Sequence, residues 1–186
     1  MSGIGRVIVG ASGSPGSVTA LRYAELFARG GGVMLLAVHA WVPPGGDLAE
    51  RRSPSPELCR LWEEAARQQL RDALLAAWGT GSPGLDARAV VRRGAPGPVL
   101  AGLACCADDL LVVGAGRRGS LARVWGGKVT RYCLAHARCP VLAVPPPALA
   151  REAGRGLRGF AYRHRELTLE RALREWESEA LDHRGW

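Results

Sequence analysis

The chain has 186 residues, of which 25 are Lys or Arg and 17 are Asp or Glu, giving a formal net charge of +8. This length suits one domain with a short extension. The sequence contains no apolar run long enough to cross a membrane and does not open on a secretory signal pattern, so we expect a cytoplasmic protein without membrane contact. The five cysteines lack metal-ligand spacing; we expect reduced, structural thiols and no metal site.

The positive charge is concentrated in the first 147 residues, which hold 17 basic and 10 acidic side chains. No acid occurs between Asp109 and Glu152. The same interval contains seven basic residues: Arg117, Arg118, Arg123, Lys128, Arg131, Arg138 and Arg151. This asymmetry favours an anionic ligand or partner near the interval, although a solvated basic surface would give the same pattern.

The first third of the chain predicts a strand, a helix and a second strand. Residues 6–10, RVIVG, have the apolar character of a short buried strand, and a turn rich in Gly and Ser follows. Apolar residues then recur with a helical period, with Ser17 as the expected N-terminal cap and glycines 30–32 as the expected end. Residues 33–41 form a continuous apolar run, which is typical of a strand covered on both faces.

The alternation of helices and strands continues to residue 147. Helices are predicted over 57–78, 95–107 and 127–137, and strands over 85–94, 109–114 and 140–147. Asp108 and Asp109 are expected in a turn before the fourth strand, and prolines 145–147 should end the last strand near a sheet edge. The order predicts an α/β fold, an open five-stranded parallel sheet with helices on both faces and right-handed crossovers.

The composition changes after Pro147, which divides the chain into a domain over 1–147 and an extension over 148–186. Within the extension, residues 166–181 place apolar side chains on one helical face. This segment is predicted to be a basic linker with a C-terminal amphipathic helix. The helix either docks loosely on its own domain, stays disordered, or binds a protein partner.

Two glycine-rich loops follow the first and fourth predicted strands, over 10–17 and 114–127. In an open parallel sheet, ligands bind beyond the carboxyl ends of the strands. Glycines let the backbone approach phosphate oxygens, and the first amides of the next helix are free to donate to them. His39, at the end of the second strand, could line the same crevice, with a hydrogen-bonded structural histidine as the alternative.

Three segments resemble the universal stress protein family: RVIVGASGSPGSVTALRYA, AVHAW and LLVVGAGRRGSLARVWGGKVTRYCLAHARCPVLAV, which span roughly residues 5–145. The resemblance implies a Rossmann-like fold of the adenine nucleotide alpha hydrolase type. It also implies a homodimer formed through the last strand, here Pro140 to Val144. Many members of the family bind ATP, whereas others bind no nucleotide.

The family's ATP motif is Gly, two residues, Gly, nine residues, Gly and then Ser or Thr. Gly114 and Gly127 match its first and third glycines, but Arg117 and Lys128 stand at the other two positions. Members that bind ATP also carry an acid in the first loop, where this chain has Ser12. These departures put ATP binding in question, and they should weaken base and sugar recognition more than anion recognition.

The leading hypothesis is therefore a non-catalytic stress-response module that weakly binds ATP, another adenine nucleotide or another phosphate ligand. The candidate binding residues are Gly10, Ser12, Gly13, Ser14, His39, Gly114, Gly116, Arg117, Gly127, Lys128 and Val129. Neither loop offers a carboxylate to hold a metal or orient water, so we expect no catalysis. We also expect no specific nucleic-acid binding, because no recognition motif is present. The alternative is a ligand-free stress protein that acts through dimerisation and protein–protein interaction.

Overall fold

The computed structural model describes residues 3–46, 54–80, 84–116 and 128–147. Its strands are β1 (Arg6–Gly10), β2 (Met34–Trp41), β3 (Ala87–Arg93), β4 (Asp109–Gly114) and β5 (Val141–Val144). Its helices are α1 (Pro15–Gly31), α3 (Pro56–Trp78), α4 (Pro96–Leu103) and α6 (Lys128–His136). The described residues up to 146 belong to one compact unit. The predicted extension over 148–186, including the helix over 166–181, lies outside the described residues.

All five strands form one parallel sheet in the order β3-β2-β1-β4-β5. The chain builds outward from β1 in one direction through β2 and β3, then returns to the other side of β1 with β4 and β5. The order therefore reverses between β1 and β4, whose registers pair Arg6 with Asp109 and Val9 with Val112. The sheet confirms the predicted fold class, and β5 lies at an edge as expected.

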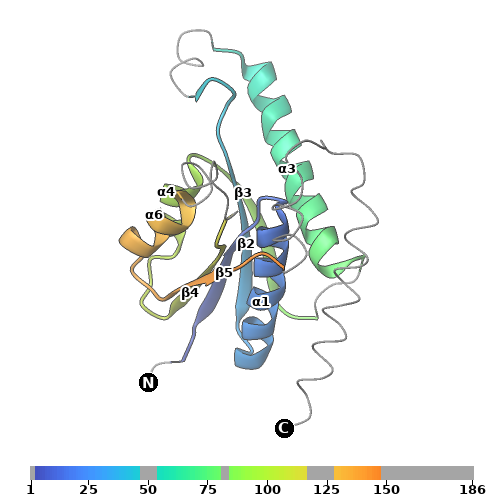
Figure 1. The fold of residues 1–186 in the computed structure, drawn as a ribbon. Coiled ribbons are helices and arrows are strands. Elements are labelled where there is room, and N and C mark those ends of the chain that lie inside the picture. The colour runs from blue at the N-terminus through green and yellow to red at the C-terminus, as the bar shows by residue number, and fades with distance from the viewer. Residues whose placement is uncertain (1–2, 47–53, 81–83, 117–127, 148–186) are drawn as a thin grey trace, which may run out of the picture. The chain divides into compact units, whose positions relative to one another are not determined.

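Helices cover both faces of the sheet, with α1 and α3 on one side and α4 and α6 on the other (Figure 1). Successive strand residues point to opposite faces, so each strand contributes to two apolar cores. Val7 and Val9 of β1 pack on the α1 side, whereas Ile8 packs on the α4 side. Burial on both faces explains why the strands β1, β2 and β4 read as continuous apolar runs.

Helix α1 begins one turn earlier than the sequence pattern suggests. Its N-terminal cap is Ser14, whose hydroxyl accepts a hydrogen bond from the Ser17 amide at 3.3 Å. The prediction of Ser17 as the cap is wrong because Pro15 fits the first helical turn, where its missing N–H costs nothing. At the other end Gly32 adopts φ +62° and closes the helix, as predicted.

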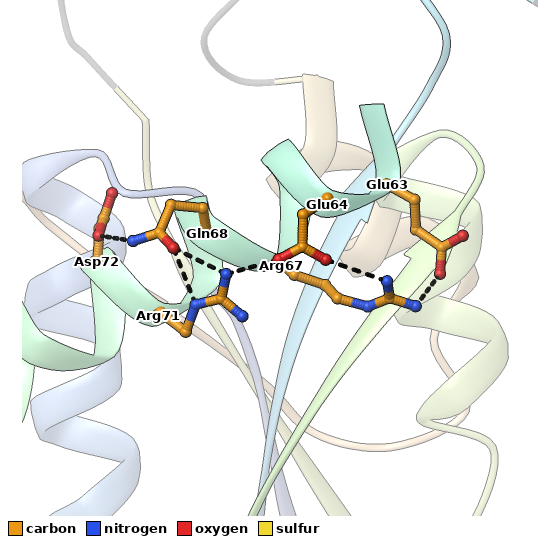
Figure 2. Close-up of polar contacts among 6 residues, drawn as sticks. All are labelled: Glu63, Glu64, Arg67, Gln68, Arg71 and Asp72. Atoms are coloured by element: carbon orange, nitrogen blue, oxygen red, sulfur yellow. Dashed lines mark hydrogen bonds and ion pairs between the residues drawn. The ribbon is translucent and has the colours of Figure 1, made fainter. Parts of the chain in front are cut away.

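Helix α3 docks through a narrow stripe of buried residues and exposes a charged face. Figure 2 shows this face: Arg67 pairs with Glu63 and Glu64, and Arg71 bonds to Glu64 and Gln68. Hydrogen bonds from Arg71 and Arg67 lower the pKa of the Glu64 carboxyl. Most of these partners lie three or four positions apart, and Glu64 and Arg71 lie two turns apart, so the contacts stabilise α3 itself and not its packing on the sheet.

Strand β4 begins at Asp109, as the predicted range 109–114 has it, and Asp109 is buried, so the separate expectation that this residue lies in a turn is wrong. Its carboxylate accepts two hydrogen bonds from Arg6, Nε to Oδ1 at 2.9 Å and a terminal nitrogen to Oδ2 at 2.8 Å. The Cys106 amide donates to Oδ2 at 3.1 Å. This last bond helps explain why α4 ends at Leu103 instead of continuing to 107: the Cys106 amide bonds to a carboxylate rather than within a helix.

Candidate anion-binding site

The candidate site lies where β1 and β4 end side by side. These neighbouring strands are parallel, so the loop after β1 and the first residues after β4 emerge at the same edge of the sheet. The reversal of strand order also falls between them, which is where open α/β sheets leave a crevice for ligands. The Ala11 amide bonds to Val38 O at 2.8 Å, which adds the end of β2 to this edge.

The first loop presents Ser12, Gly13 and Ser14 to solvent. Gly13 adopts φ +71°, a conformation that glycine accepts without strain. The Ser12 and Ser14 hydroxyl oxygens lie 3.1 Å apart, and the Ser12 amide donates to the Ser17 hydroxyl at 3.2 Å. The three serines therefore form one connected group of hydroxyls at the N-terminus of α1.

The second loop is described for Gly114, Ala115 and Gly116, whereas Arg117 and Gly127 lie outside the described residues. The Ala115 amide donates to Val144 O at 2.7 Å, and Gly116 adopts φ +75°. A Cβ on Gly114 would lie 2.8 Å from the carbonyl carbon of Gly16. Close packing against α1 therefore requires glycine at position 114, and its predicted contact with phosphate stays a prediction.

Thr130 is a residue that the sequence reasoning missed. Its buried hydroxyl donates to the Gly114 carbonyl at 2.9 Å and holds the first turn of α6 against the end of β4. Lys128 is exposed at the start of this turn, and Val129 packs against the apolar core on the α4 side. The sequence did contain a sign of this role. Thr130 lies two residues after Lys128, which stands where the family motif has Ser or Thr.

His39 is buried, and its Nδ1 lies 2.7 Å from the Ala11 carbonyl oxygen. Because a carbonyl can only accept, Nδ1 carries the proton in this bond. The bond ties the end of β2 to the loop after β1, which is the structural alternative foreseen for this histidine. Gly10 also has a packing role: a Cβ there would lie 2.9 Å from Cδ1 of Leu100.

The electrostatics of the site come from two helix N-termini. Helices α1 and α6 both begin at this edge, and both approach Gly114, α1 through Gly16 and α6 through Thr130. Neither helix has an acid among its first-turn residues, all of which are described. The partial positive charges of the two helices therefore add, and Lys128 contributes a full charge beside them.

The cysteines differ from the expectation of uniformly structural thiols. Cys133 is buried in the core, and burial raises the pKa of its thiol to about 11. Cys105 and Cys106 are exposed instead, with their sulfur atoms 3.9 Å apart. They follow α4 at the amino end of β4, which is the opposite edge of the sheet from the candidate site.

Comparison with family models matches most of the chain to one family. The model of the universal stress protein family matches residues 3–145. No curated protein matches the chain. Among the described residues, no helix combines the length and the apolar character that crossing a membrane requires.

Solved structures show the same fold. The hypothetical protein MJ0577 aligns with a TM-score of 0.60 at 16% identity, covering 77% of this chain and 97% of its own. UspA from Lactobacillus plantarum aligns with a TM-score of 0.50 at 20% identity, covering 77% of this chain and 99% of its own. A universal stress protein in complex with cAMP aligns with a TM-score of 0.48 at 26% identity, covering 77% of this chain and 98% of its own. The family match extends over more than half of the chain, so this protein belongs to the universal stress protein family.

Proposed function

We propose that this protein is a non-catalytic stress-response module that weakly binds an adenine nucleotide, ATP included, or another phosphate ligand at the candidate site. One observation carries the proposal. The N-termini of α1 and α6 meet at Gly114, at the point where the strand order reverses, and neither first turn contains an acid. Such an arrangement attracts anions whether or not the side chains around it match the family's motif.

The two helices should contribute unequally. Pro15 has no N–H, and the Ser17 amide already bonds to the carbonyl and hydroxyl of Ser14. Few amides of α1 are therefore left for a ligand. We expect the phosphate to bind on the α6 side, where Lys128 supplies charge at the start of the helix.

Weak binding follows from what the site offers to the sugar and base. Ser12 provides a neutral hydroxyl, which binds a ribose hydroxyl less strongly than a carboxylate does. None of the described site residues is an Asp or Glu that could hold a metal ion or orient water. This composition supports binding without hydrolysis.

Isothermal titration calorimetry of the full chain with ATP, ADP, cAMP and adenosine would test the proposal. We expect dissociation constants on the order of 0.1 to 1 mM for ATP at low salt, with weaker binding as the salt concentration rises. Adenosine, which has no phosphate, should bind least. The absence of heat with all three nucleotides at millimolar concentration would contradict ligand binding at this site.

A charge-matched pair of variants would locate the phosphate. Lys128→Ala removes a cation at the start of α6, whereas Arg138→Ala removes one just beyond its other end. We expect Lys128→Ala to weaken ATP binding about three- to tenfold, because it removes one partly screened charge. Arg138→Ala should leave the affinity within a factor of two. Equal losses in both variants would indicate non-specific attraction to the basic surface.

A second candidate function is supported by the capping of α1. Because the Ser14 and Ser17 hydroxyls already accept from the Ser17 and Ser12 amides, the protein could act without a ligand. It would then act through self-association and through a protein partner that binds residues 148–186. Removal of residues 148–186 should then abolish partner capture while the thermal unfolding of the compact unit is retained. An unchanged set of partners would argue against this function.

A further inference from the structure

The amino end of β4 brings together three side chains that can bind a metal ion. Cys105 and Cys106 follow α4, and Asp109 starts the strand three residues later. One ligand atom from each residue lies within 4.8 Å of the others. The sequence analysis did not predict this cluster, because it found no metal-ligand spacing and expected Asp109 in a turn and both cysteines in the helix over 95–107.

The separation of the two thiols matches the geometry of one tetrahedral ion. Their sulfur atoms lie 3.9 Å apart. Zinc–thiolate bonds of about 2.3 Å at a tetrahedral angle put two sulfurs about 3.8 Å apart. The separation of the two sulfur atoms therefore fits one ion bound by both thiolates.

The third side chain is held in place by the fold. Arg6 donates to both carboxylate oxygens of Asp109, and the Cys106 amide donates to one of them. A carboxylate fixed in this way keeps its orientation when an ion binds, as the outer partners of known metal ligands do. Arg6 also offsets the negative charge that two thiolates and a carboxylate would bring together.

We propose that Cys105, Cys106 and Asp109 form a binding site for a soft divalent cation, with Zn²⁺ as the reference ion. Each thiol loses its proton to solvent as its sulfur bonds to the ion. The exposure of both cysteines provides an entry path, and the fourth coordination position is left to water. The site lies at the opposite edge of the sheet from the candidate anion site and does not depend on it.

The test uses the full chain, reduced with a phosphine and freed of the reductant. Zn²⁺ is titrated in competition with a chromophoric chelator, and Co²⁺ is added separately because its bonds to thiolates give charge-transfer absorption. We expect one equivalent of Zn²⁺ to bind and a thiolate–cobalt band to appear. Thermal unfolding should shift upward with Zn²⁺, because the folded chain holds Asp109 beside both thiols and should bind the ion more tightly than the unfolded chain does.

Cysteine variants decide whether the ion binds at this cluster. Cys105→Ser and Cys106→Ser should each weaken Zn²⁺ binding at least about tenfold, and the double variant should lose the cobalt band. Cys59→Ser, on α3, is the matched control and should change neither. Both serine variants replace exposed side chains, so they should fold normally, which circular dichroism would check.

Three results would overturn the proposal. The first is the absence of a thiolate–cobalt band in the reduced full chain. The second is unchanged Zn²⁺ affinity in the double variant, which would place the ion on other residues such as the histidines. The third is a Cys105–Cys106 disulfide that forms and persists with Zn²⁺ present. Such a bond joins neighbouring residues and would be strained.

Discussion

Gly114 is the residue on which the geometry of the anion site depends most directly. The space for its Cβ is taken by backbone atoms of α1, with the Gly16 carbonyl carbon at 2.8 Å and the Ser17 amide nitrogen at 3.1 Å. These atoms belong to the first turn of a helix and cannot rotate away. Thr130 bonds to the carbonyl of the same glycine, so both helix N-termini are positioned by this one residue.

Gly114→Ala should therefore lower the free energy of unfolding by about 1 to 3 kcal/mol, the usual cost of forcing extra volume into a packed region. Gly10→Ala is the matched control, since the nearest atom to its Cβ is the movable end of the Leu100 side chain. We expect the control to lose less. Urea unfolding of both variants measures the difference, and an equal or smaller loss for Gly114→Ala would show that α1 can shift away.

Sequence patterns identified the loops of this site but not the bonds between their residues. Gly13 was predicted in a turn and Gly32 at the end of a helix, and both have positive φ. The roles of Ser14 and Thr130 were not predicted, because a hydroxyl's partner depends on which backbone groups the tertiary fold brings within reach. For the same reason the sequence could not decide whether His39 faces a ligand or a carbonyl.

Between elements, the contact of Arg6 with Asp109 joins the starts of β1 and β4. The Asp109 carboxylate is buried and accepts two hydrogen bonds from the Arg6 guanidinium. The two residues lie 103 positions apart in the sequence. Burial by itself would raise the pKa of Asp109, but the hydrogen bonds from Arg6 and the Cys106 amide lower it overall. The carboxylate therefore binds protons less readily in the folded state than in the unfolded chain.

The sign of this shift predicts how stability depends on pH. A lowered pKa in the folded state stabilises the protein above the unfolded value, which is about 3.9 for Asp. That contribution is lost as the pH falls through the folded pKa. Asp109→Asn should cost about 2 to 4 kcal/mol at pH 7, because it leaves Arg6 without its charged partner.

The difference between the wild type and Asp109→Asn should shrink as the pH falls below about 4, and urea unfolding at pH 7, 5 and 3 measures it. Asp86→Asn serves as the control, since that carboxylate is exposed and lies 3.6 Å from an exposed Arg88. A gap that stays constant over this range would mean that the Asp109 carboxylate contributes through its shape and not its charge.

Elements were predictable where burial dominates and less so where a polar contact sets the boundary. The strands β1, β2 and β4 appear in the sequence as apolar runs because both of their faces are covered. The start of β4 at residue 109 was predicted, but the end of α4 could not be placed from the sequence. That end depends on the Asp109 carboxylate, which accepts from the Cys106 amide and whose partner Arg6 is distant in the chain.

At the scale of the whole molecule, the parallel sheet separates two kinds of chemistry. Helix N-termini gather at the carboxyl ends of the strands and favour anions, whereas the proposed cation site occupies the amino end of β4. The parallel sheet could be predicted from the alternation of elements, since parallel strands need crossovers. The order of the strands in the sheet decides which loops lie next to each other at each edge. That order depends on packing between elements, which the sequence pattern does not show.

The last strand provides the remaining prediction, which concerns self-association. β5 lies at the edge of the sheet. The carbonyl of Pro140, just before β5, accepts from the Leu111 amide of β4, and the Val144 carbonyl accepts from the Ala115 amide just after β4. Since alternate residues of a parallel strand bond to alternate sides, the backbone groups of Val141 and Ala143 point away from β4. A second copy of the chain could pair with them, as the predicted homodimer through Pro140 to Val144 requires.

Ala143→Pro removes one outward N–H without taking a donor from the β4–β5 ladder, and edge strands tolerate proline at such positions. We expect the wild type to sediment as a dimer at micromolar concentration and Ala143→Pro as a monomer with a similar melting temperature. Ala143→Ser keeps the amide and should stay dimeric. If Ala143→Pro were still dimeric, the subunits would associate through another surface, because backbone pairing along β5 cannot continue past the missing donor.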